Sequence, residues 1–162
     1  MYRWVIFLHV VSAFIFFMAH GVSIGVALRL RRERQPERLR TLLELSDTSR
    51  MFVHPSLLVI LLSGIAGGFM LDWWRMGWIW ASLALLVFIT VVMFRGLSPY
   101  FNKLRKAVGS PYREGGKKQP ALETAPAAEI EALLTSGNMV VMTGIGIGIM
   151  AIIVYRMMFK PF

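Results

Sequence analysis

The sequence contains no cysteine and only three histidines among its 162 residues. The absence of cysteine excludes structural disulfides, thiolate metal sites and cysteine nucleophiles. Any redox chemistry must therefore come from a bound cofactor. Acidic residues are also scarce, since nine Asp and Glu stand against eighteen Lys and Arg. No pattern typical of a hydrolytic triad or a phosphate-binding loop is present, and no pair of carboxylates lies within an apolar run.

The excess positive charge lies beside long hydrophobic runs. Hydrophobic residues make up 56% of the chain, which is above the usual share in soluble domains. Basic residues in such positions are typical of membrane topology signals that face anionic lipid, and no nucleic-acid recognition motif accompanies them. We therefore predict an integral membrane protein whose partner is the lipid bilayer, with no role in nucleic-acid binding.

Four apolar segments are long enough to cross a bilayer, which takes about 20 mostly apolar residues in a helix. They cover residues 4–28, 51–71, 77–94 and 139–159. The first segment is longer than the apolar part of a signal peptide and lacks a small-residue cleavage site, so we interpret it as a retained span. The sequence thus predicts an all-α, polytopic protein whose single domain, residues 1–162, is an antiparallel bundle of four transmembrane helices.

The distribution of Lys and Arg predicts the orientation of the bundle. Connections 29–50 and 95–138 hold seven basic residues each, and the rest of the chain holds four. Because cytoplasmic loops carry the excess of Lys and Arg, both connections are predicted to be cytoplasmic and both termini to be outside. The corresponding location is a membrane whose cytoplasmic side carries the two long connections.

The two connections carry different local patterns. Apolar residues spaced from Pro36 to Leu45 predict a short amphipathic helix lying on the inner membrane surface. Residues 97–119 combine Ser-Pro and Gly-Gly pairs with basic residues, which predicts a mobile segment. A helical turn is expected to begin near Ala127.

The histidines are the main candidates for a functional site. His9 and His20 are eleven residues apart in the first span, which places them on one helix face, about 20° beyond three whole turns. They differ in depth by about 16 Å, so they cannot bind the same metal ion. His54 opens the second span at a depth similar to that of His20. We predict that His20 and His54 face each other across the bundle as axial ligands of haem b, and that His9 is a further candidate ligand whose partner is a methionine or another residue.

Other interpretations of these residues stay open at this stage. A histidine in a membrane helix also serves as a hydrogen-bonding group toward a neighbouring helix, as a proton relay or as a copper ligand. The spacings of Gly64 with Gly68 and of Gly144 with Gly148 match the G-x-x-x-G pattern, which allows close packing of helices.

The order of several short motifs resembles a known family. They are Leu8-His9 in the first span, HPSLLVILLSGIAGG in the second, GWIWASLALL in the third, the basic stretch NKLRKAVG and the final Lys160-Pro161-Phe162. Together they resemble the HemJ-type protoporphyrinogen oxidases and the related copper-resistance D-type four-helix membrane proteins. This resemblance implies a four-helix bundle that binds haem b near His9 and handles tetrapyrrole or respiratory-chain electrons.

The chain departs from that family pattern in its third span. The pattern has a lysine early in this span, where the chain reads Ala81-Ser82-Leu83, and a histidine near its end, where the chain reads Met93-Phe94-Arg95. We predict a haem b-binding membrane protein with a redox role, in electron transfer or in tetrapyrrole or quinol oxidation, acting with a membrane redox partner or a second copy of the chain. The alternatives are a cofactor-free accessory subunit of a larger membrane complex and copper-related transport.

Overall fold

The computed structural model describes residues 1–136 and 138–161, with only the backbone described at positions 138 and 139. Its elements in chain order are α1 (Tyr2–Leu30), α2 (Pro36–Met70), the 3-10 turn η1 (Trp73–Arg75), α3 (Gly77–Ala107), β1 (Tyr112–Glu114), β2 (Lys117–Gln119), α4 (Ala127–Thr135) and α5 (Asn138–Phe159).

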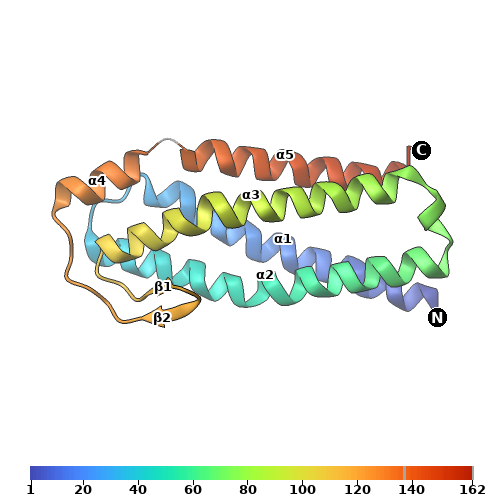
Figure 1. Cartoon of the computed structure of the whole chain (residues 1–162), viewed down its shortest axis with the longest axis horizontal. Helices are drawn as coiled ribbons and strands as arrows, with labels where there is room; N and C mark the ends of the chain where they lie inside the picture. Colours follow the sequence, from blue (N-terminus) through green and yellow to red (C-terminus); the bar gives the residue numbers. More distant parts are fainter. Residues whose placement is uncertain (137, 162) are drawn as a thin grey trace.

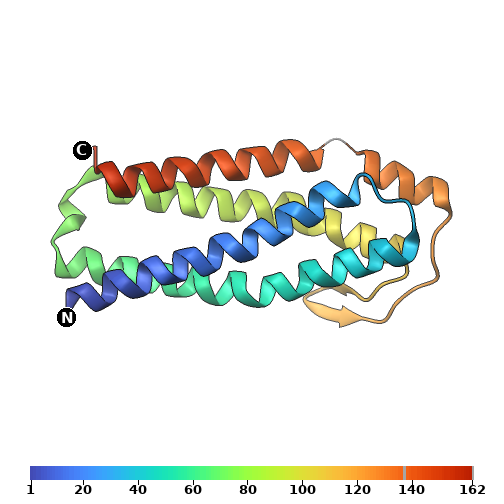
Figure 2. The same ribbon diagram turned by 180° about the vertical axis from the view of Figure 1, so that it is seen from behind.

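The four long helices run side by side and alternate in direction (Figure 1). Within the described residues four helices are long and apolar enough to cross a membrane, which confirms the predicted all-α architecture with four spans. Both termini lie at one end of the bundle, and the two long connections lie at the other end, as the reverse view also shows (Figure 2). We call this second end the basic end, since it carries the connections formed by residues 29–50 and 95–138.

Two predictions for the basic end are wrong. Helix α2 is continuous from Pro36 to Met70, so the predicted surface helix is its first three turns. Its leucines Leu39 and Leu43 are 0% exposed, because they pack against other helices and not against a membrane surface. Helix α3 likewise continues to Ala107, through Pro99, where a mobile segment was predicted.

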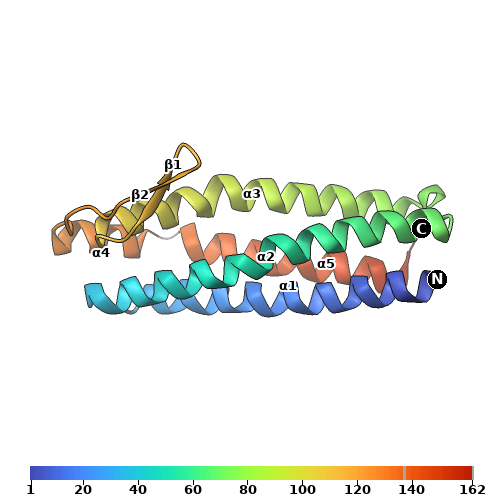
Figure 3. The same cartoon turned by 90° about the horizontal axis from the view of Figure 1, so that it is seen from below.

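The remainder of the predicted mobile segment forms an antiparallel hairpin of β1 and β2. Gly115 and Gly116 have positive φ and form its turn, a conformation that glycine adopts without steric cost. Asn102 of α3 holds the hairpin through two hydrogen bonds to the backbone of Arg113, of 2.8 and 3.2 Å. Seen from below, the hairpin projects from the basic end beside α3 (Figure 3). The helical turn predicted near Ala127 is present as α4.

The basic end also contains the main hydrophobic core. Its buried side chains come from α1, α2, α3 and α4, and one of them, Val108, directly follows α3. They are Val26, Ala27, Leu30, Leu39, Leu43, Leu104, Ala107, Val108, Ile130 and Leu134. These side chains fix the ends of α2 and α3 beyond the apolar spans.

Helices α1 and α2 pack along a seam of small residues. Buried positions of α1 follow alternating steps of four and three residues, as at Ser12, Phe16 and Ala19, which is the spacing of a left-handed helix pair. On α2 the buried serines Ser49, Ser56 and Ser63 recur every seven residues. Small side chains at these positions let the two backbones approach closely.

The glycine pairs of α2 and α5 differ in how closely other side chains approach them. A Cβ added at Gly64 would lie 3.4 Å from the His9 ring, and one at Gly68 would lie 2.9 Å from the Trp74 ring. Gly64 therefore leaves room for the His9 ring of α1, and Gly68 for the Trp74 ring of η1. Gly144 and Gly148 have no described atom within 4 Å of such a Cβ, whereas one at Gly146 would lie 2.5 Å from the Met93 methyl group. On α5 the glycine that lies close to α3 is therefore Gly146, which is on the other side of the helix from Gly144 and Gly148.

Candidate functional site

His9 lies in the seam between α1 and α2. Its Nδ1 is 3.0 Å from the Ser63 hydroxyl oxygen. Ser63 lies 2.5 Å from the Val59 carbonyl oxygen, which can only accept, so the single hydroxyl hydrogen is donated there. His9 Nδ1 is therefore the donor toward Ser63, and Nε2 carries the lone pair. A histidine bound to metal typically has this arrangement, with its other ring nitrogen donating to a neighbour. The chemistry of His9 thus fits both an interhelical hydrogen bond and a haem ligand.

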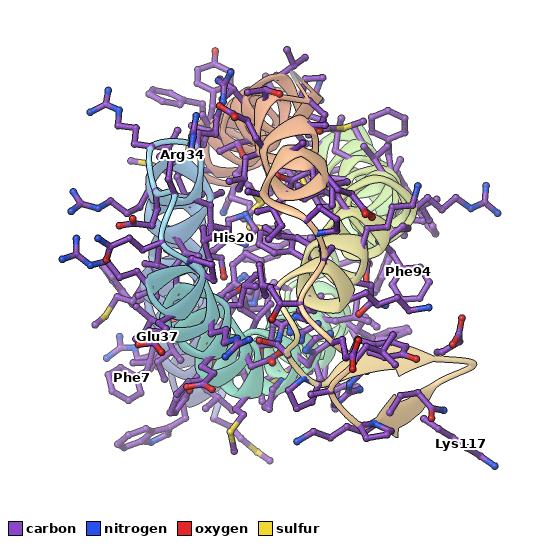
Figure 4. All side chains as sticks on the ribbon, turned by 90° about the vertical axis from the view of Figure 1, so that its left-hand side faces the viewer. Phe7, His20, Arg34, Glu37, Phe94 and Lys117 are labelled. Carbon is purple, nitrogen blue, oxygen red and sulfur yellow. The ribbon has the colours of Figure 1, made fainter. Side chains whose placement is uncertain are left out.

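His20 lies in a cleft between α1 and α5, on the inner side of the bundle. Figure 4 shows its position between the helices, whereas Phe7 and Phe94 project outwards. The cleft has a volume of about 380 Å³. Its other lining residues are Phe17, Gly21 and Ile24 of α1 and Ile147, Met150, Ala151 and Val154 of α5. Within the described residues the His20 ring makes no hydrogen bond, and it stacks on Phe16 with the ring centres 5.5 Å apart and the planes 11° from parallel.

His54 lies in a different cavity, at the basic end. Its Nδ1 is 3.0 Å from the Arg50 carbonyl oxygen one turn earlier on α2, and its ring is exposed. The cavity beside it is formed by α2, the end of α3 and the hairpin.

The structure does not bring His20 and His54 together as the predicted facing pair. Two hydrogen bonds join α1 and α2, one between His9 and Ser63 and one between Ser23 and Ser49. The second bond lies fourteen residues later on α1 and fourteen residues earlier on α2, as expected for antiparallel helices. This register sets His20 level with residue 52, close to the depth of His54. His54 is five residues beyond Ser49, however, which at 100° per residue turns it about 140° away from the seam. It therefore points to the side of α2 opposite α1.

The three histidines are thus spread over three places. Among the described residues no group of three or more His, Asp or Glu could hold a metal ion. A haem requires less from the protein, since one or two axial side chains and an apolar pocket hold it.

The cleft at His20 meets these requirements. An imidazole and the thioether of Met150 line the same cleft, and His with Met is an accepted pair of haem ligands. The remaining lining is apolar, and the volume lies within the range of 300 to 1,000 Å³ typical of ligand pockets. The cleft therefore combines two candidate ligand side chains, His20 and Met150, with an apolar lining.

Two residues that matter here were not predicted, Ser63 and Met150. Ser63 had a signal in the sequence, because it belongs to the seven-residue spacing of serines on α2. Met150 had none, since five of the eleven methionines fall within or beside the fourth span and nothing local distinguishes the one that lines the cleft with His20.

Comparison with known proteins found no family model, no curated protein and no solved structure that matches this chain.

Proposed function

We propose that this multi-pass membrane protein binds haem b in the cleft between α1 and α5 and has a redox role in the bacterial inner membrane. The observation that carries the proposal is that His20 and Met150 line one apolar cleft of about 380 Å³. An imidazole costs free energy in an apolar interior unless a partner satisfies it. Within the described residues His20 has no hydrogen-bond partner, which supports iron as its partner.

The residues of the cleft would each have a definite task. His20 would donate an imidazole lone pair to iron, with its ring held by the stacking on Phe16. Met150 would offer a thioether on the side of α5, a ligand that raises the reduction potential. Ile24, Ile147 and the other apolar residues of the cleft would exclude water, which also tunes the potential. Bound haem supplies the one-electron chemistry that a chain without cysteine lacks.

The proposed orientation has both termini outside and the basic end in the cytoplasm. The fourteen Lys and Arg residues of the two long connections support it, since both connections lie at the same end of the bundle. In this orientation the electron partner reaches the cleft from within the membrane, as a quinol, a tetrapyrrole or a second membrane protein would.

The test is the visible spectrum of the detergent-purified protein, oxidised and then reduced with dithionite. We expect sharp b-type bands in the wild type, their loss in His20→Ala, and shifted bands in Met150→Leu. His54→Ala is the matched control, because its ring lies in another cavity, and its spectrum should equal that of the wild type.

Two results would contradict the proposal. A colourless protein from haem-replete cells would leave an accessory subunit as the better interpretation. Bands that survive in His20→Ala and disappear in His9→Ala would move the haem to the seam between α1 and α2.

A further inference from the structure

A second cavity, of about 400 Å³, lies at the basic end, between α2, the end of α3 and the hairpin. It is separate from the cleft at His20, because none of its lining residues belongs to α1 or α5. The hairpin, with Lys117 near its turn, projects from the bundle on this side (Figure 4). The lining is strongly basic, and the function proposed above does not use it.

Positive charge exceeds negative charge in this cavity. Arg50, Arg105, Arg113 and Lys118 line it together with a single carboxylate, Asp47. Asp47 forms ion pairs with both Arg50 and Arg105. Among the described residues no carboxylate pairs with Arg113 or Lys118. The cavity therefore holds a net positive charge that no side chain of the described chain neutralises.

The hairpin places two of these charges next to each other. Arg113 of β1 is the direct cross-strand partner of Lys118 of β2. Like charges at directly opposed positions destabilise a pair of strands. The two side chains nevertheless stand on the hairpin face that borders the cavity, and Asn102 holds the hairpin in this place through the backbone of Arg113. An anion bound between Arg113 and Lys118 would attract both side chains and so offset their mutual repulsion.

The buried arginine of the cavity also has a donor without an acceptor. Arg105 is 4% exposed. Its Nη1 bonds to Asp47, and its Nη2 donates to the Leu43 carbonyl oxygen at 2.8 Å. Its Nε has no hydrogen-bond partner among the described residues, and a buried N–H without an acceptor is costly. Burial lowers the pKa of Arg105, and the nearby charge of Arg113 lowers it further. The negative charge of a bound anion would favour the charged guanidinium and so oppose this lowering of the pKa.

We propose that this cavity is a binding site for a phosphate-bearing anion. Arg105 would form the buried floor of the site, and Arg113 and Lys118 would close over the phosphate from the hairpin. Arginine matches phosphate oxygens with its fork of N–H donors, and lysine adds a point charge.

The position of the cavity allows two sources for that phosphate. Met51 and His54 line it, and they are the first residues of the second apolar span. The cavity thus lies where a span meets the basic end, at the level of lipid headgroups. The phosphate can therefore belong to an anionic phospholipid or to a soluble phosphate compound.

The experiment measures both sources on the full chain. In one arm, the protein in nanodiscs of phosphatidylcholine is titrated with phosphatidylglycerol, and bound lipid is counted by native mass spectrometry. In the other arm, inorganic phosphate and pyrophosphate are titrated by calorimetry into the same phosphatidylcholine nanodiscs. The test variant is Arg113→Gln/Lys118→Gln, whose changes are on the exposed hairpin. The matched control is Lys117→Gln, which removes one charge from the same hairpin outside the cavity lining.

We expect the double variant to bind about a hundredfold more weakly, since it loses two charged contacts and each is worth about tenfold. Lys117→Gln should bind as the wild type does. Saturable binding in the lipid arm supports the proposal with a headgroup as the source, and saturable binding in the phosphate arm supports it with a soluble compound. Absence of binding in both arms would overturn it. So would an equal loss in Lys117→Gln, because general surface attraction would then explain the binding.

Discussion

The two ends of the bundle are held together by different forces. At the basic end, large side chains of four helices form a dry core in which Leu39, Leu43 and Leu104 are 0% exposed. Along the apolar spans the buried positions of α2 carry small residues, such as Ser56 and Gly67, and large side chains such as Phe94 are exposed on the outside, while a few, such as Phe16, are buried between helices.

This difference follows from the solvent around each region. Burying a leucine at the basic end removes apolar surface from water, which is the main driving force of folding. In the bilayer the same burial gains little, because lipid is as apolar as the side chain. Helices there associate through close packing of backbones and through hydrogen bonds between them. The effect of a substitution therefore depends on its region as well as on its burial.

The largest expected effect of a substitution is at the basic end. Leu104→Ala should lower the free energy of unfolding by about 2–5 kcal/mol, because it leaves a cavity in a core surrounded by water. Phe94→Ala, on the same helix but 74% exposed, should change it little. Unfolding in mixed micelles with increasing SDS measures both. Equal losses in the two variants would contradict the distinction between the regions.

A somewhat smaller effect is expected where the seam is overpacked. Gly64→Leu would force a side chain against the His9 ring, which lies 3.4 Å from the position of the new Cβ. Such overpacking typically costs about 1–3 kcal/mol. Gly144→Leu on α5 meets open space and serves as the control in the same unfolding assay. A Gly64→Leu protein as stable as Gly144→Leu would show that close packing does not hold the seam.

The smallest effect concerns a single hydrogen bond between spans. Ser63→Ala removes the acceptor of His9 Nδ1–H and should cost about 0.6–2 kcal/mol. Ser56→Ala is the matched control, since Ser56 lies one heptad earlier and donates to Phe52 of its own helix. A double-mutant cycle of Ser63→Ala with His9→Ala isolates the pair. A coupling energy near zero would mean that the bond contributes nothing.

The spans could be predicted from the sequence, whereas the lengths of their helices could not. Apolar length alone identifies a transmembrane helix, and the four spans follow from it. The extensions of α2 toward Pro36 and of α3 toward Ala107 depend on Leu39 and Leu104 meeting in one core. That meeting is a tertiary contact between segments more than sixty residues apart in sequence, which local patterns do not contain.

The candidate site shows the same limit at the level of single residues. Counting 100° per residue places His9 and His20 on one face, and that count is correct for an isolated helix. The seam of α1 alternates steps of three and four residues, so it passes through Ala19 and leaves His20 beside it, facing α5. The arrangement of the whole bundle determines that α5 covers this side of α1 and that Met150 of α5 lies there.

The most direct test of the central claim fills the cleft at His20 without touching a ligand. Gly21 lines the cleft, and an added Cβ there meets no described atom within 4 Å, so Gly21→Leu should fold normally. Gly25 is equally open but does not line the cleft, which makes Gly25→Leu the control. The reduced-minus-oxidised spectrum should show the b-type bands in wild type and Gly25→Leu and lack them in Gly21→Leu. Unchanged bands in Gly21→Leu would contradict haem binding in this cleft.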